Sequence, residues 1–83
     1  MVTVKYFASL RQIAGKEEDQ FYLNGETTVL QLGDIIAETQ PQIGEMVREK
    51  KLAIAVNQDV VPLDTLINDG DEVALLPPFS GGV

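Results

Sequence analysis

One segment with a helical apolar stripe, residues 28–39, lies between segments that carry the apolar patterns of β-strands. The stripe comprises Val29, Leu32, Ile35, Ile36 and Thr39. These positions fall within about a third of the circumference at about 100° per residue, as in a helix with one buried face. Thr28 and Gln31 fit a capping box at its start, and Pro41 ends it. A chain of 83 residues has room for one domain with one modest core. We therefore predict an α+β fold, with a small mixed sheet wrapped round one main helix.

Short segments on both sides of this helix have the patterns of strands. Residues 2–7 alternate with period 2, so that Val2, Val4 and Tyr6 share a face that we expect to enter the core. Residues 52–56 are a continuous apolar run, typical of a strand covered on much of both faces. Asn24-Gly25, Asn57-Gln58 and residues 68–71 carry turn signals. The predicted strands are residues 2–7, 20–23, 52–56, 59–62 (an edge segment) and 72–76.

Two smaller helical pieces complete the prediction. Residues 9–14 favour one or two helical turns with Leu10 and Ile13 inward, stopped by Gly15. The run Lys16-Glu17-Glu18-Asp19 is predicted to be a charged loop. A further piece is marked by Ile43, Met46 and Val47, and we expect this stripe to pack in the core rather than to bind a partner.

Phe7 and Leu76 lie on the wrong side of their strands for core residues. Phe7 alternates with the core set of residues 2–7, and Leu76 shares a face with Glu72 rather than with Val73 and Leu75. If the first and last strands are neighbours, the two side chains meet on the open face of the sheet. Such a pair indicates either a partner-binding surface or a rim that a loop covers. We predict that Phe7 and Leu76 form an apolar interface, with Arg11 and Val60 at its rim.

Composition excludes several classes of chemistry. The chain has no cysteine and no histidine, which excludes disulfides, zinc sites built from these residues and imidazole-based triads. The net charge of −7 repels phosphate backbones, so we expect no nucleic-acid partner. No segment approaches the 18 apolar residues of a membrane span, and the N-terminus lacks the profile of a signal peptide. We therefore expect no membrane association and a cytoplasmic protein.

The polar residues of the predicted body offer no catalytic set. Asp69-Gly70-Asp71 resembles a fragment of a calcium loop, but the spacing and the terminal glutamate of such a loop are missing. A turn explains it better, and we expect no metal site. Ser9 and Ser80 have no histidine to activate them. We therefore do not expect a self-sufficient enzyme.

The last seven residues differ in character from the rest of the chain. Pro77-Pro78 resists both helix and sheet pairing and favours an extended path away from the body. Gly81-Gly82 has no side chains and could thread a narrow channel. An ordinary frayed terminus could have the same sequence. The predicted organisation is a domain over residues 1–76 and an extended tail over residues 77–83.

Several motifs together resemble a known family, the ubiquitin-like β-grasp sulfur carriers, and within it the MoaD family of small subunits of molybdopterin synthase. The resemblance covers nearly the whole chain and therefore implies a ubiquitin-like β-grasp fold. It rests on Tyr6-Phe7-Ala8 with Arg11 and Gly15, on residues 55–58, on residues 66–73 (Leu-Ile-Asn-Asp-Gly-Asp-Glu-Val) and on Pro77-Pro78-Phe79-Ser80-Gly81-Gly82.

The resemblance also implies a function for the tail. In this family a MoeB-like enzyme uses ATP to adenylate the terminal glycine carboxylate, which then becomes a thiocarboxylate and donates sulfur to a cyclic pyranopterin precursor. The resemblance thus makes Gly82 the sulfur-carrying residue, with these forms transient and no cofactor bound. A MoaE-like large subunit, in a heterotetramer, would supply the catalytic side chains and receive the tail. The tail residues that would enter its pocket are Pro77, Pro78, Phe79, Ser80 and Gly81. The chain would then be a non-catalytic, sulfur-donating subunit.

Val83 departs from the family pattern, because it places the terminal carboxylate one residue beyond Gly82. The 83-residue chain would then be a precursor that is trimmed, or the valine is a peculiarity of this lineage or of the expressed chain. Other functions remain open beside molybdopterin synthesis. They are a sulfur carrier of another pathway, like the thiamine-pathway carrier ThiS, a ubiquitin-like modifier of lysines, and a non-catalytic interaction domain.

Overall fold

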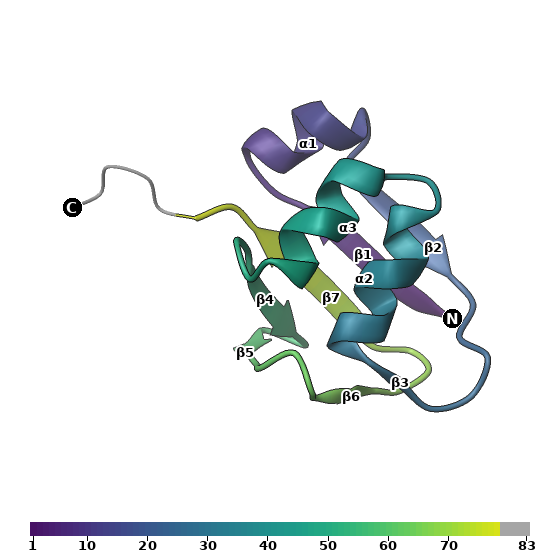
Figure 1. Ribbon diagram of the computed structural model, residues 1–83. Coiled ribbons are helices and arrows are strands. Elements are labelled where there is room, and N and C mark those ends of the chain that lie inside the picture. The colour runs from purple at the N-terminus through teal and green to yellow at the C-terminus, as the bar shows by residue number, and fades with distance from the viewer. Residues whose placement is uncertain (79–83) are drawn as a thin grey trace.

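A five-stranded mixed sheet in the order β2-β1-β7-β4-β5 forms one layer, and the helices α2 and α3 cross one of its faces (Figure 1). The computed structural model describes residues 1–78. The elements are β1 (Val2–Tyr6), α1 (Ser9–Ala14), β2 (Glu18–Phe21), β3 (Thr27–Thr28), α2 (Val29–Ala37), α3 (Pro41–Arg48), β4 (Ala53–Val56), β5 (Asp59–Val60), β6 (Leu66–Ile67) and β7 (Glu72–Leu76). The predicted mixed sheet with one main helix is thus confirmed.

The first and last strands, β1 and β7, are parallel neighbours at the centre of the sheet. All other pairs in this sheet are antiparallel. The alternation of β1 is as predicted, because Val2, Val4 and Tyr6 are all at most 1% exposed. Val73 and Leu75 are buried on the same side in β7, next to the partners Val4 and Tyr6. The inner face of this central strand pair forms the sheet side of the core.

The helix α2 begins as the sequence predicts. The Thr28 side chain accepts from the Gln31 N–H at 3.2 Å, and the Gln31 side chain accepts from the Thr28 N–H at 2.9 Å. Val29, Leu32 and Ile36 are buried against the sheet, whereas Thr39 lies beyond the helix end and is exposed. The apolar stripe is therefore shorter than predicted, because α2 ends at Ala37.

The helix α3 packs against α2 through two glycines. A Cβ atom added to Gly44 would lie 2.7 Å from the Gly33 carbonyl oxygen and would overlap the Ala37 side chain. The backbones of the two helices therefore approach too closely for any side chain at Gly44. The predicted core stripe of α3 is confirmed, because Ile43 and Val47 are buried and Met46 packs half-buried against the same core.

Two predictions for the first third of the chain are wrong. Ile13 is exposed, and the inward residues of α1 are Leu10 and Ala14, which lie one helical turn apart. The predicted charged loop over residues 16–19 is partly strand, because β2 begins at Glu18 rather than at Gln20. Its register pairs Lys5 with Glu18 and Val4 with Asp19, so acidic residues suit an edge strand opposite a lysine.

Two short strands were not predicted at all. β3 and β6 pair antiparallel to form a separate two-stranded sheet, with Thr27 opposite Ile67 and Thr28 opposite Leu66. Each has two residues, which is too short for a periodic signal. Along the chain, β3 connects β2 to α2, and β6 connects β5 to β7.

The contact between α2 and α3 gives a stability prediction. Gly44→Ala should lower the free energy of unfolding by about 2 kcal/mol or more, because the overlap with Ala37 and with the Gly33 backbone outweighs a helix-propensity gain of about 1 kcal/mol. Urea unfolding followed by circular dichroism measures the loss. Gln42→Ala, at an exposed position of the same helix, is the control and should be neutral or slightly stabilising. Equal stability of the two variants would contradict this packing.

Candidate functional site

The C-terminal segment leaves the molecule at the end of β7. Pro77 is half-buried, Pro78 is exposed, and neither belongs to a helix or strand, so the chain leads away from the sheet here (Figure 1). β7 itself ends at Leu76, the bound that the sequence predicted for this strand. The predicted site residues Phe79, Ser80, Gly81 and Gly82, together with Val83, lie outside the described residues.

Phe7 and Leu76 lie on neighbouring strands at this same end of the sheet. The register pairs Tyr6 with Leu75, and the Phe7 N–H donates to the Leu75 carbonyl oxygen at 3.2 Å, so the pairing continues one residue past β1. Both residues then fall on the face opposite the core. Phe7 is 38% exposed and Leu76 is half-buried. The predicted juxtaposition of these two side chains on the open face follows from the register.

Small apolar residues extend this surface across the sheet. Ala53 pairs with Leu76, and Ala55 pairs with both Ala74 and Val60, so all of them share the outer side. Val60 is 72% exposed at the edge strand. We call this set the outer apolar face, and it consists of Phe7, Ala53, Ala55, Val60, Ala74 and Leu76, of which Ala55 is buried. In β4, small residues (Ala53 and Ala55) alternate with large ones (Ile54 and Val56), and this alternation could have predicted the outer apolar face. All four residues are apolar, so the run has no polar positions that mark an outer side.

Basic side chains border the outer apolar face beside Phe7. Arg11 of α1 is exposed and lines a small hollow together with Lys5, Phe7, Glu17 and Glu18. Lys5 lies 3.5 Å from the Glu72 carboxylate, whereas Arg11 makes no ion pair within residues 1–78. Arg11 thus lies beside Phe7, and Val60 lies on the edge strand β5; their role at the rim of an interface stays a prediction.

A tight turn fixes the position of Phe7 relative to α1. The Leu10 N–H donates to the Phe7 carbonyl oxygen at 3.0 Å, and Ala8 between them has φ 51° and ψ −126°. A non-glycine residue in this region stores about 1–3 kcal/mol of strain, which persists only where the surroundings hold it. Here the buried Leu10 anchors α1, and the β7 pairing anchors Phe7.

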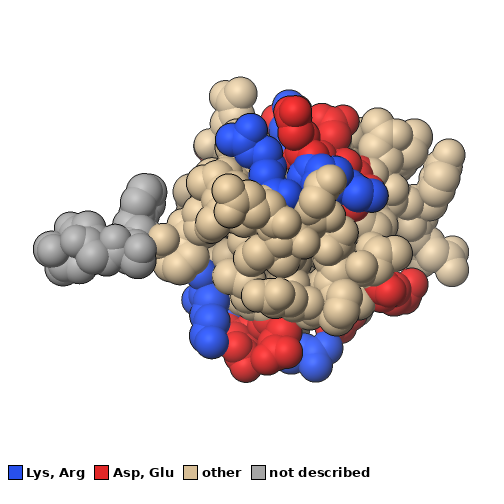
Figure 2. Space-filling view, turned by 90° about the horizontal axis from the view of Figure 1, so that it is seen from above, with Lys and Arg blue, Asp and Glu red and all other residues tan. Residues whose placement is uncertain are grey.

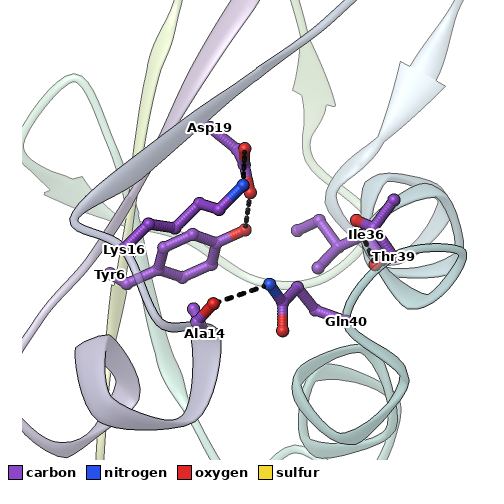
Figure 3. Close-up of polar contacts among 7 residues, drawn as sticks. All are labelled: Tyr6, Ala14, Lys16, Asp19, Ile36, Thr39 and Gln40. Carbon is purple, nitrogen blue, oxygen red and sulfur yellow. Dashed lines mark hydrogen bonds and ion pairs between the residues drawn. The ribbon is translucent and has the colours of Figure 1, made fainter.

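Polar contacts hold α1 at its other end (Figure 3). The Tyr6 hydroxyl donates to Asp19 at 3.0 Å, and Lys16 lies 3.0 Å from the other oxygen of that carboxylate. The Gln40 amide donates to the Ala14 carbonyl oxygen at 2.9 Å, which joins the end of α1 to the start of α3. Burial raises the pKa of the Tyr6 phenol above its ordinary range, and the hydrogen bond to Asp19 raises it further.

The Asp69-Gly70-Asp71 segment is a turn, as predicted. Gly70 has φ 91°, a conformation that favours glycine. The Asp71 carboxylate accepts from the Asn68 N–H at 2.8 Å and from the Asn57 amide at 2.9 Å, so both of its oxygens are engaged in holding turns. Within residues 1–78 no group of three potential metal-ligating side chains comes together, and no helix is long and apolar enough to cross a membrane.

The fold is that of a ubiquitin-like β-grasp protein. A mixed sheet packs against one main helix, and Pro77 and Pro78 follow directly on its central strand, β7. The chain belongs to the ThiS family, which matches residues 4–82. Molybdopterin synthase sulfur carrier subunits of Chlamydomonas reinhardtii and Escherichia coli are 42% and 34% identical to it. The matches cover 98% of both chains for the first, and 99% of this chain and all of the relative for the second.

Solved structures agree with these relatives. The small archaeal modifier protein 1 of Methanosarcina acetivorans superposes with a TM-score of 0.75 at 32% identity, covering 98% of this chain and 95% of the other. A complex of subunits 1 and 2 of the molybdopterin-converting factor of Helicobacter pylori contains a chain with a TM-score of 0.64 at 29% identity, with 98% and 97% covered.

The Tyr6 hydrogen bond gives a prediction at neutral pH. Tyr6→Phe should lower the free energy of unfolding by about 1 kcal/mol, because the Asp19 carboxylate loses a donor. Tyr22→Phe is the matched control, since Tyr22 is the other tyrosine of the chain and is 80% exposed; it should change nothing.

The raised pKa of Tyr6 adds a pH dependence. The folded protein holds the phenol proton more tightly than the unfolded chain, whose tyrosine titrates near pH 10. Its contribution is therefore complete below about pH 10 and is lost as the pH rises further. Urea unfolding between about pH 9 and pH 11 should show a steeper loss of stability for the wild type than for Tyr6→Phe. Parallel curves would show that the phenol is not held in this way.

Proposed function

We propose that this chain is the sulfur-carrier subunit of a molybdopterin synthase. One observation carries the proposal: the family match runs to residue 82, so it includes the Gly81-Gly82 pair and leaves only Val83 outside. The relatives named as sulfur carrier subunits align over almost their whole length, which supports the same role for the whole chain rather than for a part of it.

The chemistry resides in the C-terminal carboxylate, because the chain has no cysteine that could hold sulfur as a persulfide. A carboxylate is a poor electrophile, so it must first gain a leaving group. The Gly82 carboxylate oxygen attacks the α-phosphorus of ATP on a MoeB-like enzyme, pyrophosphate leaves, and an acyl-adenylate forms. A sulfur nucleophile at the oxidation level of sulfide then attacks the acyl carbon, the bond to the AMP oxygen breaks, AMP leaves, and the thiocarboxylate remains. We place this reaction in the cytoplasm, where ATP is available.

The thiocarboxylate sulfur next acts as the nucleophile towards a pyranopterin precursor. Within this proposal a MoaE-like large subunit holds that precursor and supplies the catalytic side chains, while the extended segment from Pro77 to Gly81 reaches into its pocket. The chain is then a substrate-like, non-catalytic subunit. Its acidic charge of −7 suits a partner with a basic pocket built for a phosphorylated pterin.

The outer apolar face is the surface that we assign to the large subunit. It lies on the side of the sheet opposite α2 and α3, and it includes Leu76 at the end of β7. A partner that buries Phe7 and Leu76 would thereby receive the tail beside this surface. The H. pylori complex of two subunits supports an assembly of this kind, which we extend to a heterotetramer.

A second function is favoured by the similarity to the archaeal modifier protein. A protein modifier would use the same adenylation but would transfer its carboxyl group to a lysine amine rather than donate sulfur. Intact mass of the protein from its native host distinguishes the two, because a thiocarboxylate replaces one oxygen by sulfur, whereas a modifier forms isopeptide-linked conjugates. A ThiS-like carrier would carry the same sulfur but would not bind the pterin-binding large subunit.

The assignment of the partner surface predicts the effect of one substitution. Phe7→Ala should weaken the complex with the large subunit by about 1–4 kcal/mol and leave thermal stability nearly intact, because Phe7 anchors an interface and not the core. Calorimetric titration measures the binding. Leu30→Ala is the matched control, since Leu30 has the same exposed fraction, 38%, on α2. A large loss of stability with unchanged binding would instead make Phe7 a core residue.

The position of Val83 predicts which chain can be activated. Val83 displaces the carboxylate by about 3.5 Å along an extended chain, more than the misplacement of about 1 Å that can cost an enzyme a hundredfold. The 83-residue chain should therefore be a poor substrate for adenylation, and deletion of Val83 should make it competent. The assay combines the activating enzyme, ATP and a sulfur donor, followed by intact mass. Efficient thiocarboxylation of the untrimmed chain would refute this account of the tail.

A further inference from the structure

A second hollow, lined by both apolar and polar residues, lies away from the outer apolar face. Met1, Tyr22 and Leu66 line it, and they are 40%, 80% and 50% exposed. The hollow has a volume of about 580 Å³ and includes the loop around Gly25 and the segment that follows β6. We call it the β3–β6 groove. Single exposed apolar residues are ordinary, but three large ones around one hollow are typical of a binding surface.

The β3–β6 groove and the tail lie at opposite ends of β7. The groove includes Asn68 and Asp69, which precede β7 by a few residues, whereas the tail follows Leu76 at the other end. Five residues of strand separate the two ends by about 13 Å. Figure 1 likewise places the N-terminus and β6 away from the point at which β7 leads into the tail. A short segment bound in the groove would therefore leave Phe7 and Leu76 uncovered.

The charges at the groove favour a cationic binding partner. Glu26 and Asp69 both line it, and no lysine or arginine does so among residues 1–78. Asp69 is 83% exposed and pairs with the amino group of Met1, whereas Glu26 has no such partner among the described ion pairs. A second copy of a chain with charge −7 would be repelled here. A cationic surface is attracted both by the rim and by the whole molecule.

We propose that the β3–β6 groove docks a protein segment in which basic side chains flank a large apolar one. The apolar side chain would lie against Tyr22 and Leu66, and the basic groups would face Glu26 and Asp69. Tyrosine is a frequent anchor of such contacts because its large ring loses little conformational entropy on binding. The groove would thus hold the chain on one protein while another acts on its C-terminus.

The surface seen from above, on the side of α1, has a different distribution of charge. Acidic and basic residues there gather along two opposite edges, and uncharged residues cover the area between them (Figure 2). On the helical surface the acidic groups are partly neutralised, since Asp34 pairs with Arg48 and Glu49 pairs with Lys51. In the β3–β6 groove the Asp69 carboxylate is likewise paired, with the amino group of Met1, so Glu26 is the acidic group that lies beside exposed apolar side chains without a partner among the described ion pairs.

The experiment uses the full chain labelled with ¹⁵N and a short capped peptide in which arginine and leucine alternate. The expected amide shift changes lie at Tyr22, Glu26 and Leu66, and Tyr22→Ala should weaken binding about tenfold. Val60→Ala is the control, because Val60 is similarly exposed, at 72%, but lies on the outer apolar face. A peptide with glutamate in place of arginine should not bind. Thermal unfolding of each variant separates a loss of binding from a loss of fold.

Three outcomes would overturn the proposal. Shifts spread over acidic residues outside the groove, with binding by Tyr22→Ala unchanged, would mean attraction by net charge alone. Equal binding of the glutamate peptide would remove the role of the acidic rim. Self-association of the chain that Tyr22→Ala abolishes would make a second copy the occupant. None of these outcomes bears on sulfur transfer, which the mass assay tests separately.

Discussion

The parallel pairing of β1 and β7 is the interaction on which the rest of the structure depends. It joins the first strand of the chain to the last, so all other elements lie in the crossover between the two strands. Backbone hydrogen bonds extend it at both ends, from Thr3 to Asp71 and from Phe7 to Leu75. Because parallel neighbours need a crossover that covers one face of the sheet, α2 is packed on one side and the other side stays open. The pairing of β1 and β7 therefore places the core on one face of the sheet and the outer apolar face on the other, and it fixes the end of β7 that Pro77 follows.

In the proposed function, binding and chemistry are divided between two parts of this chain. The folded body has no cysteine or histidine, and the tyrosine that it buries has a pKa raised by burial and by its bond to Asp19. Its polar network positions elements: Tyr6, Asp19 and Gln40 hold α1, and the Ala8 turn holds Phe7. The proposed reaction therefore rests on a backbone carboxyl group that other proteins activate. A small domain suits this role, because it needs only recognition surfaces and an extended end.

The most specific sequence motif of the body is architectural. In Asp-Gly-Asp-Glu-Val, Gly70 supplies a positive φ, Asp71 holds two turns through its carboxylate, and Val73 enters the core. Asn57 completes this arrangement, since its side chain bonds both Asp71 and the Glu72 N–H. The motif thus fixes the start of β7, and the direction of β7 sets where the tail leaves the sheet. Its residues position the backbone and take no part in the proposed reaction.

Local patterns in the sequence determined the elements whose causes are themselves local. The capping box of Thr28 and Gln31, the alternation of Val2, Val4 and Tyr6, and the turn at Gly70 depend on neighbours within a few residues, so they could be predicted. The outward position of Phe7 and Leu76 followed from the same alternation. The absence of cysteine and the Gly81-Gly82 pair likewise pointed to the tail from the sequence alone.

Only the tertiary structure decided the features that rest on distant partners. β2 starts at Glu18 because this residue is the register partner of Lys5 in β1 and because the Tyr6 hydroxyl donates to Asp19, and no local pattern contains either partner. Gly44 is required because Gly33 and Ala37 of another helix lie against it. The β3–β6 groove combines Met1, Tyr22 and Leu66, which are far apart in the chain and meet only when β1, β3 and β6 are in place. Contacts between residues so far apart arise from packing of the whole core, and a single sequence carries no periodic signal for them.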